Sequence, residues 1–254
     1  MDPTQALEVH PVFAHASIFA GLGPDALEAI AADFLPRHFP RDAPLLLEGD
    51  PAEVYYVLAD GQVKVIQTSA EGFEVILHLL GPGDLVGALP NLNQGTYPAS
   101  VIALTEVVAY AISPADFEAI LERHPSVAIH LLRFAASRLR ASHARLRELA
   151  TERVERRIAR TLSRLAGQIG KRTERGIVLG APLSRQDLAE LTGTTLYTVS
   201  RTLKEWERQG ILIAGREQVI LLNTHALVAI GEDLPSRPLR PSLRQRIDGR
   251  AQLR

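Results

Sequence analysis

The sequence contains no cysteine and no long apolar run. Without cysteine the protein cannot form disulfides, zinc–thiolate sites, cysteine nucleophiles or iron–sulfur clusters held by cysteine. No apolar segment reaches the roughly 18 residues needed to cross a bilayer, and the start of the chain lacks the charged-then-apolar pattern of a signal peptide. We therefore expect a soluble, cytoplasmic protein, and its 254 residues are enough for two domains of ordinary size.

Positive charge is also scarce, but only in the first half of the chain. Residues 1–132 contain four lysines and arginines against seventeen acidic residues, a net charge of −13. Residues 133–254 contain twenty-four basic residues against twelve acidic ones, a net charge of +12. The second half should therefore attract a polyanion such as DNA, which the first half should repel.

The stretch 183–206, in the basic half, has the pattern of two short helices joined by a tight turn. Ser184 and Asp187 are spaced as a capping box that starts the first helix. Gly193 then breaks this helix, and Thr195 caps the second one. The predicted buried positions are Leu188, Ala189 and Leu191 in the first helix and Val199, Leu203 and Trp206 in the second. The opposite face of the second helix carries Tyr197, Ser200, Arg201, Lys204 and Arg208. An exposed face of hydrogen-bond donors on a rigid helix pair suits the major groove of DNA.

An ordinary helical hairpin with a solvated polar face is the alternative interpretation of this stretch. Two features favour a helix-turn-helix instead. Ala189, four residues before Gly193, is small enough for the two helices to cross closely. Residues 211–214 and 217–222 are then typical of two strands of a β-hairpin around the turn 215–216. A helix-turn-helix followed by such a hairpin is a winged helix.

Between residues 35 and 112 the pattern changes to short alternating runs separated by turn residues. The runs are LLLE, EVYYVLA, QVKVIQTS, FEVILHLL, SVIAL and VVAYAI. Strands at this spacing are typical of a small antiparallel barrel or roll. Asp60-Gly61 has the residue types of a two-residue hairpin turn. Because helical patterns flank the strands at 17–32 and 114–123, the expected fold class is α+β.

Residues 126–149 have a helical pattern throughout. Small and apolar residues repeat there at alternating spacings of four and three, forming a seam of Ala128, Leu132, Ala135, Leu139, Ser142, Leu146 and Leu149. A seam over three heptads suits pairing with another helix better than packing on a sheet, and a homodimer is the economical explanation. A new, arginine-rich amphipathic helix is predicted from Val154 to Leu165.

In this order of roll, seam helix and winged helix, the chain resembles the Crp/Fnr family of bacterial transcription regulators over residues 17–224. Matching features in the roll are Gly49-Asp50, Asp60-Gly61 and Gly83-Asp84-Leu85. The resemblance implies an antiparallel β-roll sensor domain of the cyclic-nucleotide-binding type at 1–125, a dimerisation helix at 126–150 and a winged helix-turn-helix DNA-binding domain at 151–225. It also implies a homodimer that binds palindromic promoter sites and has RNA polymerase as a partner.

The tail, residues 226–254, is rich in arginine and proline. Such a composition does not bury a core, so we expect a basic, disordered segment there. Its role is either to add salt-dependent affinity for DNA or simply to keep the protein in solution.

The resemblance extends to individual residues of the recognition helix. Arg201 matches the family arginine that reads guanine, since a guanidinium can donate two hydrogen bonds to N7 and O6. Ser200 matches the serine of the Fnr-like branch. Tyr197 stands where glutamate is common, and Leu196, which alternatively packs inward, stands where the family has arginine or valine. The half-site should therefore differ from the family consensus beside its guanine. The predicted DNA-binding residues are Thr195, Leu196, Tyr197, Ser200 and Arg201, with Arg185, Lys204, Arg208 and Arg216 as phosphate contacts. The alternative for these cations is a solvated surface side chain, which explains Arg208 and Arg216 equally well.

The sensor half departs from the family's cyclic AMP pocket. Members that bind cyclic AMP carry Gly-Glu-Leu followed by Arg-Ser-Ala, where this chain has Gly87-Ala88-Leu89 and Pro98-Ala99-Ser100. Both the carboxylate that binds ribose and the arginine that binds phosphate are missing. A buried phosphate needs a cation or a dense nest of amides. We therefore expect no binding of cyclic AMP or cyclic GMP.

Three alternatives stay open for the sensor domain: it detects a gas bound through haem, it binds another metabolite, or it needs no ligand. Family members that lack the cluster cysteines include nitric oxide-responsive regulators of denitrification, and a histidine is a usual haem ligand. His143 on the seam helix is the candidate, although an exposed or interfacial histidine is the ordinary interpretation. An effector pocket is predicted from Ser142, His143, Leu89 and Ser100.

Catalysis is not expected. Metalloenzymes built on a small β-roll need two or three convergent histidines and a carboxylate. This sequence has no His-x-His pair, and only His38 and His78 fall in the predicted strands, so no metal site is expected. A serine nucleophile elbow is also missing. Nonspecific architectural DNA binding would fit the basic half of the chain but not an attached sensor domain.

Overall fold

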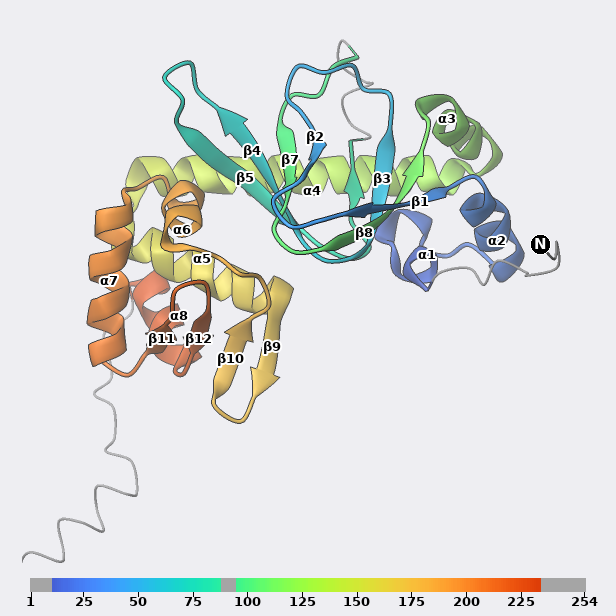
Figure 1. Cartoon of the computed structure of the whole chain (residues 1–254). Helices are drawn as coiled ribbons and strands as arrows, with labels where there is room; N and C mark the ends of the chain where they lie inside the picture. Colours follow the sequence, from blue (N-terminus) through green and yellow to red (C-terminus); the bar gives the residue numbers. More distant parts are fainter. Residues whose placement is uncertain (1–10, 88–94, 234–254) are drawn as a thin grey trace, which may run out of the picture.

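The computed structural model describes residues 11–87 and 95–233. A β-roll, the long helix α4 (Pro125–Thr151) and a C-terminal domain follow one another along the chain. Helix α4 runs past the roll, from the N-terminal helices at one end to α6 (Arg185–Thr192) and α7 (Leu196–Arg208) at the other (Figure 1). The expected α+β class, with an antiparallel roll, a long helix and a winged helix-turn-helix, is confirmed.

Two antiparallel four-stranded sheets form the roll in the described part of the chain. Their orders are β1-β8-β3-β6 and β2-β7-β4-β5. The strands are β1 (Leu35–Phe39), β2 (Pro44–Leu46), β3 (Tyr55–Asp60), β4 (Val63–Thr68), β5 (Glu74–Leu80), β6 (Leu85–Val86), β7 (Ser100–Ala103) and β8 (Val107–Ile112). Alternation places Val63, Val101 and Ala103 inside, between the sheets. The predicted runs thus became strands. Strand β1 contains His38, which was expected to lie in a strand, but it matches none of the alternating runs because it contains a proline and has mostly exposed side chains.

The two-residue hairpin expected at Asp60-Gly61 is wrong. Strands β3 and β4, on either side of this turn, do not pair with each other but belong to different sheets. Gly61 has φ of +81°, and a Cβ on it would lie 2.1 Å from the carbonyl oxygen of Glu106. Glycine is therefore required because the chain crosses from one sheet to the other against a neighbouring loop, rather than because of a hairpin.

Helices cover one end of the roll and lead into α4. They are α1 (Val12–His15), the 3-10 helix η1 (Ser17–Phe19), α2 (Pro24–Ala32) and α3 (Pro114–Arg123). Ser113 caps α3 by accepting a hydrogen bond from the backbone amide of Asp116. One face of α4 packs on this end through the buried residues Val127 and Leu131. A separate face of α4 is therefore left for the predicted seam.

The C-terminal domain combines a helix-turn-helix with a four-stranded sheet. Its elements are α5 (Val154–Ile169), β9 (Gly170–Thr173), β10 (Gly176–Leu179), α6, α7, β11 (Leu212–Ala214), β12 (Val219–Leu221) and α8 (Thr224–Glu232). The predicted wing hairpin is present, as β11 pairs with β12. The sequence did not reveal β9 and β10, which complete the sheet in the order β11-β12-β10-β9.

The expected start of the tail at residue 226 is wrong. Helix α8 crosses this position and packs on α5, with Leu227 and Gly231 buried. Its apolar run, ALVAIG, is too short to signal a helix on its own, but α5 supplies the surface that buries it. The remaining tail, residues 234–254, lies outside the described residues.

The roll and the C-terminal domain are in direct contact. Strand β5 lies against α6, and Ile66, Ile76 and Leu104 of the roll share one hydrophobic cluster with the helix-turn-helix. Lys64 of β4 donates to Asp187 of α6 at 3.0 Å, and both side chains are largely buried. Burial disfavours the carboxylate of Asp187, but hydrogen bonds from Ser184 and Lys64 outweigh it and lower its pKa.

Candidate nucleic-acid interface

The first helix of the predicted motif, α6, begins and ends as its sequence predicts. The Ser184 hydroxyl accepts from the amide of Asp187 at 3.0 Å, and the Asp187 carboxylate accepts from the amide of Ser184 at 2.9 Å. This is the predicted capping box. Gly193 ends the helix in the left-handed region, with φ of +60° and ψ of +48°. The turn therefore places α7 at a fixed angle to α6.

Helix α7 buries the predicted stripe. Thr195 caps it by accepting from the amide of Thr198 at 3.2 Å. Val199, Leu203 and Trp206 are all buried in the core of the domain. Because this stripe is fixed in the core, the opposite face of α7 must point to solvent. Helix α7 also lies at the edge of the molecule, on the side away from the roll (Figure 1).

The predicted base-reading residues lie on this exposed face. Tyr197 is 74% exposed and Leu196 is 48% exposed, so the inward-packing alternative for Leu196 is wrong. Thr195 and Arg201 are exposed, whereas Ser200 is partly covered. The face thus combines a guanidinium, hydroxyls and apolar surface, which are the groups that read base edges and thymine methyls.

The predicted phosphate contacts surround the same face. Lys204 is exposed on α7, Arg216 is exposed in the wing turn, and Arg185 is partly buried at the start of α6. None of these cations forms an ion pair with another described residue, and neither does Arg201. Arg208, which was also predicted as a phosphate contact, is exposed but pairs with Glu205 at 2.5 Å. The unpaired cations are available to an anionic ligand.

A second candidate site is a cavity of about 210 Å³ between the roll and α4. Its lining is largely apolar and includes Leu46, Val65, Leu77, Leu85, Val86, Val101 and Phe134. Three polar side chains also line it, those of His78, Tyr97 and Arg138, and the Tyr97 hydroxyl is already engaged with the carbonyl of Val54. Among the described lining residues there is no carboxylate. The cavity is smaller than the 300–1,000 Å³ that is usual for drug-sized ligands.

His78 is held neutral at this cavity. Burial, together with the positive charges of Arg138 and Arg145, lowers the pKa of its imidazole to about 4. The Arg138 guanidinium bonds to Asp84 at 3.0 Å and lies 4.7 Å from the centre of the Phe134 ring. The sequence pattern does not predict Arg138 as a pocket cation, because this residue lies on α4, after the strands of the roll. The signal in the sequence is a second stripe of α4, formed by Leu131, Arg138 and Arg145 at a spacing of seven residues, which lies beside the roll.

The four predicted effector residues do not come together in this chain. Ser142 lines an adjoining groove of about 480 Å³ between β5, α4 and α5, which shares Leu77, His78 and Arg138 with the cavity. His143 is exposed and lines neither hollow. Ser100 accepts from the amide of Glu48 at 2.9 Å, and Leu89 lies outside the described residues. Haem binding by His143 therefore stays a prediction, which would place the group at the interface with a second copy rather than in these two hollows.

Residues 11–87 and 95–233 contain neither a cluster of metal ligands nor a membrane-spanning helix. No group of three or more histidines, aspartates or glutamates gathers there as a metal site would require. No helix in this part is long and apolar enough to cross a bilayer.

Comparison with known proteins gives the same two-domain division. The cyclic nucleotide-binding domain model matches residues 36–124, and the Crp-like helix-turn-helix domain model matches residues 156–230. The cyclic AMP receptor protein of Thermus thermophilus is 32% identical over 198 residues, which is 78% of this chain and 88% of that protein. The CRP-like cAMP-activated global transcriptional regulator of Mycobacterium tuberculosis is 28% identical over 216 residues, 85% of this chain and 96% of that protein.

Solved structures share the fold. The c-di-GMP responsive global regulator CLP of Xanthomonas campestris superposes with a TM-score of 0.69 at 25% identity, covering 78% of this chain and 99% of that one. FixK2 of Bradyrhizobium japonicum, 23% identical, also has a TM-score of 0.69, with coverages of 81% and 99%. The chain therefore belongs to the Crp/Fnr family of DNA-binding transcription regulators.

Proposed function

We propose that the protein is a homodimeric regulator that reads palindromic promoter DNA through two copies of α7 and responds in its roll to a signal other than cyclic AMP. The observation that carries the proposal is the exposed face of α7, where Arg201 and Lys204 have no ion-pair partner among the described residues. These two cations can contact phosphate or base edges without first breaking an internal ion pair, unlike Arg208, which is held by Glu205.

The α4 seam supports the dimer. Leu132, Leu139 and Leu146 are 71%, 58% and 63% exposed in the single chain. Ala128, Ser142 and Leu149 are exposed as well, and Ala135 is partly covered. A row of exposed leucines at heptad spacing is the pattern that two paired helices bury. Two recognition helices related by a two-fold axis would then sit roughly 34 Å apart, about one turn of duplex.

The cavity supports a signal other than cyclic AMP. The nucleotide's ribose needs an acceptor for its hydroxyl, and no carboxylate lines the described part of the cavity. Arg138 is the cation that the described lining offers to a phosphate, but Asp84 already pairs with it. Two relatives are named for cyclic AMP, one as activated by it and one as its receptor, so calorimetry should test directly whether this protein binds it. Titration of purified protein should give no heat of binding with cyclic AMP or cyclic GMP; a dissociation constant in the low micromolar range for either would overturn this part of the proposal.

The regulatory role does not include catalysis. The relatives are transcription regulators, and a dimer bound at a promoter would act through RNA polymerase. Purified polymerase in a transcription reaction, with and without the protein, would show whether transcript levels change. Equal transcript from a bound promoter and from an unbound one would rule out this partner.

The dimer is tested by charging the seam. Leu132→Glu with Leu139→Glu should convert a dimer to a monomer in sedimentation velocity, because two like charges would face their copies across the two-fold axis. Such a monomer should lose at least tenfold in affinity for a palindrome while keeping its affinity for one half-site. Val228→Glu, at an exposed apolar position of α8, is the matched control and should leave the dimer intact. A wild-type protein that sediments as a monomer at micromolar concentration would contradict the proposal.

A further inference from the structure

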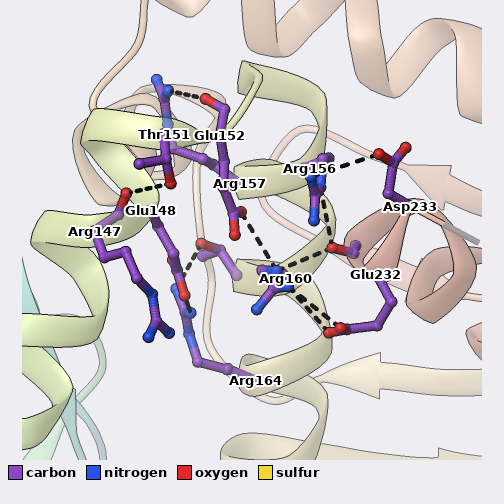
Figure 2. Close-up of polar contacts among 12 residues, drawn as sticks. Arg147, Glu148, Thr151, Glu152, Arg156, Arg157, Arg160, Arg164, Glu232 and Asp233 are labelled. Carbon is purple, nitrogen blue, oxygen red and sulfur yellow. Dashed lines mark hydrogen bonds and ion pairs between the residues drawn. The ribbon is translucent and has the colours of Figure 1, made fainter.

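Arg157 makes an unusual set of contacts at the junction of α4 and α5. Its guanidinium donates to three backbone carbonyl oxygens: that of Glu152 at 2.9 Å, Thr192 at 3.0 Å and Gly193 at 3.2 Å. Glu152 lies where α4 gives way to α5, as Figure 2 shows. The other two carbonyls belong to the turn between α6 and α7. One side chain therefore connects the end of the seam helix to the turn of the DNA-reading motif.

The neighbouring arginines of α5 are engaged differently. Arg156 and Arg160 bond to the carbonyl of Gly231 in α8 and form ion pairs with acidic residues, as Arg164 does with Glu148 (Figure 2). Arg157 forms no ion pair with any described residue. All of its described bonds go to backbone. A planar, five-donor fork is suited to holding several fixed carbonyls at once, which a lysine ammonium on a flexible stem is not.

A second contact holds the same turn from the side of α4. A Cβ on Gly193 would lie 2.7 Å from Cδ2 of Leu149, so the leucine packs directly beneath the turn. Gly193 is also in the left-handed region, which leaves the turn little freedom to adopt another shape. The turn is thus fixed between the last seam leucine and the Arg157 fork. Movement at the end of α4 cannot leave the turn where it is.

From these contacts we infer that Arg157 is a positioning residue, one that sets the direction of α7 relative to α4 without touching DNA. The inference rests on the proposed dimer, in which the direction of α7 decides the separation of the two recognition helices. The spacing of half-sites that the protein prefers should therefore depend on Arg157. A change at the junction, carried through the fork, would alter that spacing and hence DNA binding.

A purely structural role makes a different prediction. The carbonyls of Thr192 and Gly193 lie at the end of α6, where backbone groups lack partners within the helix. If Arg157 only satisfies them, its loss lowers stability and leaves the preferred spacing unchanged. The spacing profile therefore separates the two roles.

The experiment uses the full-length protein and a half-site selected from random-sequence duplex. Two copies of this half-site are placed at the preferred spacing and at spacings one and two base pairs shorter or longer, and binding is followed by fluorescence anisotropy. The wild-type protein should discriminate at least tenfold between the preferred spacing and the others. Arg157→Met should reduce that discrimination to less than threefold, while affinity for a single half-site stays within about threefold of wild type.

Two further variants complete the design. Arg157→Lys keeps the charge and the stem but loses the fork, so it should also flatten the profile, and it covers the case in which Arg157→Met does not fold. Arg156→Met is the matched control, because Arg156 does not contact the turn, and its profile should equal that of wild type. A flattened profile in Arg156→Met, or wild-type discrimination in both Arg157 variants, overturns the inference. If the wild-type protein itself shows no preferred spacing, the proposed dimeric reading of DNA fails first, and the inference fails with it.

Discussion

Among single residues, Arg201 carries the sharpest expectation about sequence reading. Arg201→Ala should weaken binding to the selected site by about 1–3 kcal/mol and relax the preference at one base pair, because a bidentate contact to guanine is lost. Competition titrations with duplexes substituted at each position would locate the loss. Lys204→Ala serves as the comparison, since a lost phosphate contact should weaken all sequences equally. Equal loss on selected and random duplex in Arg201→Ala would contradict base reading.

His78 predicts how stability depends on pH. Its folded-state pKa of about 4 is below the value near 6.5 expected in the unfolded chain. As pH falls from about 6.5 towards 4, the unfolded state binds a proton that the folded state does not, so the free energy of unfolding decreases; above 6.5 the contribution is fully present. The loss by pH 5 should be on the order of 1 kcal/mol, allowing for the partial exposure of the ring.

The measurement is urea denaturation at pH 7.5 and at pH 5. His78→Leu should show a smaller decrease between the two than wild type does, because the group that titrates is gone. His143→Gln, at an exposed position, should keep the full decrease. An unchanged decrease in His78→Leu would show that other groups account for the acid sensitivity.

At this scale the sequence was informative wherever a residue acts through its neighbours in the chain. The Ser184–Asp187 capping box and the Thr195 cap depend on hydrogen bonds within three residues, so spacing alone predicts them. Arg138 and Arg157 act across elements. Their partners, Asp84 and Thr192, are 54 and 35 residues away, and spacing along the chain carries no record of such distances.

At the scale of elements, the pairing of α4 with α5 depends on a buried charge. Glu148 is 5% exposed, and its carboxylate bonds to Arg164 at 2.6 Å, while the Arg164 side chain remains half exposed. Removing Arg164 and removing Glu148 should therefore lower the free energy of unfolding by different amounts. Arg164→Ala leaves a buried carboxylate without its cation and should cost about 3 kcal/mol. Glu148→Ala leaves a guanidinium that can turn to water, and should cost about 1 kcal/mol.

Urea denaturation of the two variants at pH 7.5 tests this asymmetry. Arg208→Ala breaks the exposed pair with Glu205 on α7 and should change stability by less than about 0.5 kcal/mol, which makes it the control. Equal costs for Arg164→Ala and Glu148→Ala would mean that burial of the carboxylate does not govern the pair.

A helix or strand could be predicted where the spacing of its own apolar residues marks the face that it buries. The seam of α4 and the buried stripe of α7 follow from helical spacing. Strand partners did not follow, because pairing is decided by which surfaces meet in the folded chain. That is why Asp60-Gly61 suggested a hairpin where β3 and β4 separate into two sheets. Helix α8 and the strands β9 and β10 are short and depend on burial against α5 and β12.

For the whole molecule, the division of charge along the chain predicts the salt dependence of binding. Phosphate contacts release counterions, so the logarithm of the binding constant should fall linearly with the logarithm of salt concentration. Arg185→Ala and Arg216→Ala should each make that slope shallower by about 1. Arg37→Ala, in the acidic roll, should leave it unchanged. A slope that does not respond to Arg185 or Arg216 would exclude both residues as phosphate contacts.

The contact between the roll and α6 has a further consequence for how the protein can be divided. The sequence suggests two separate domains. However, Ile66, Ile76 and Leu104 of the roll share a hydrophobic core with Leu188 and the other buried residues of the C-terminal domain. A C-terminal fragment cut at the α4–α5 junction would expose this apolar surface and leave Asp187 without Lys64. The α4–α5 junction separates the sensor from the DNA-binding domain along the chain, but it does not separate their hydrophobic cores. A chimera that joins this C-terminal domain to the β-roll of another family member would need a matching apolar surface on the new roll. Domain exchange in this protein is therefore limited by packing between the domains rather than by the linker.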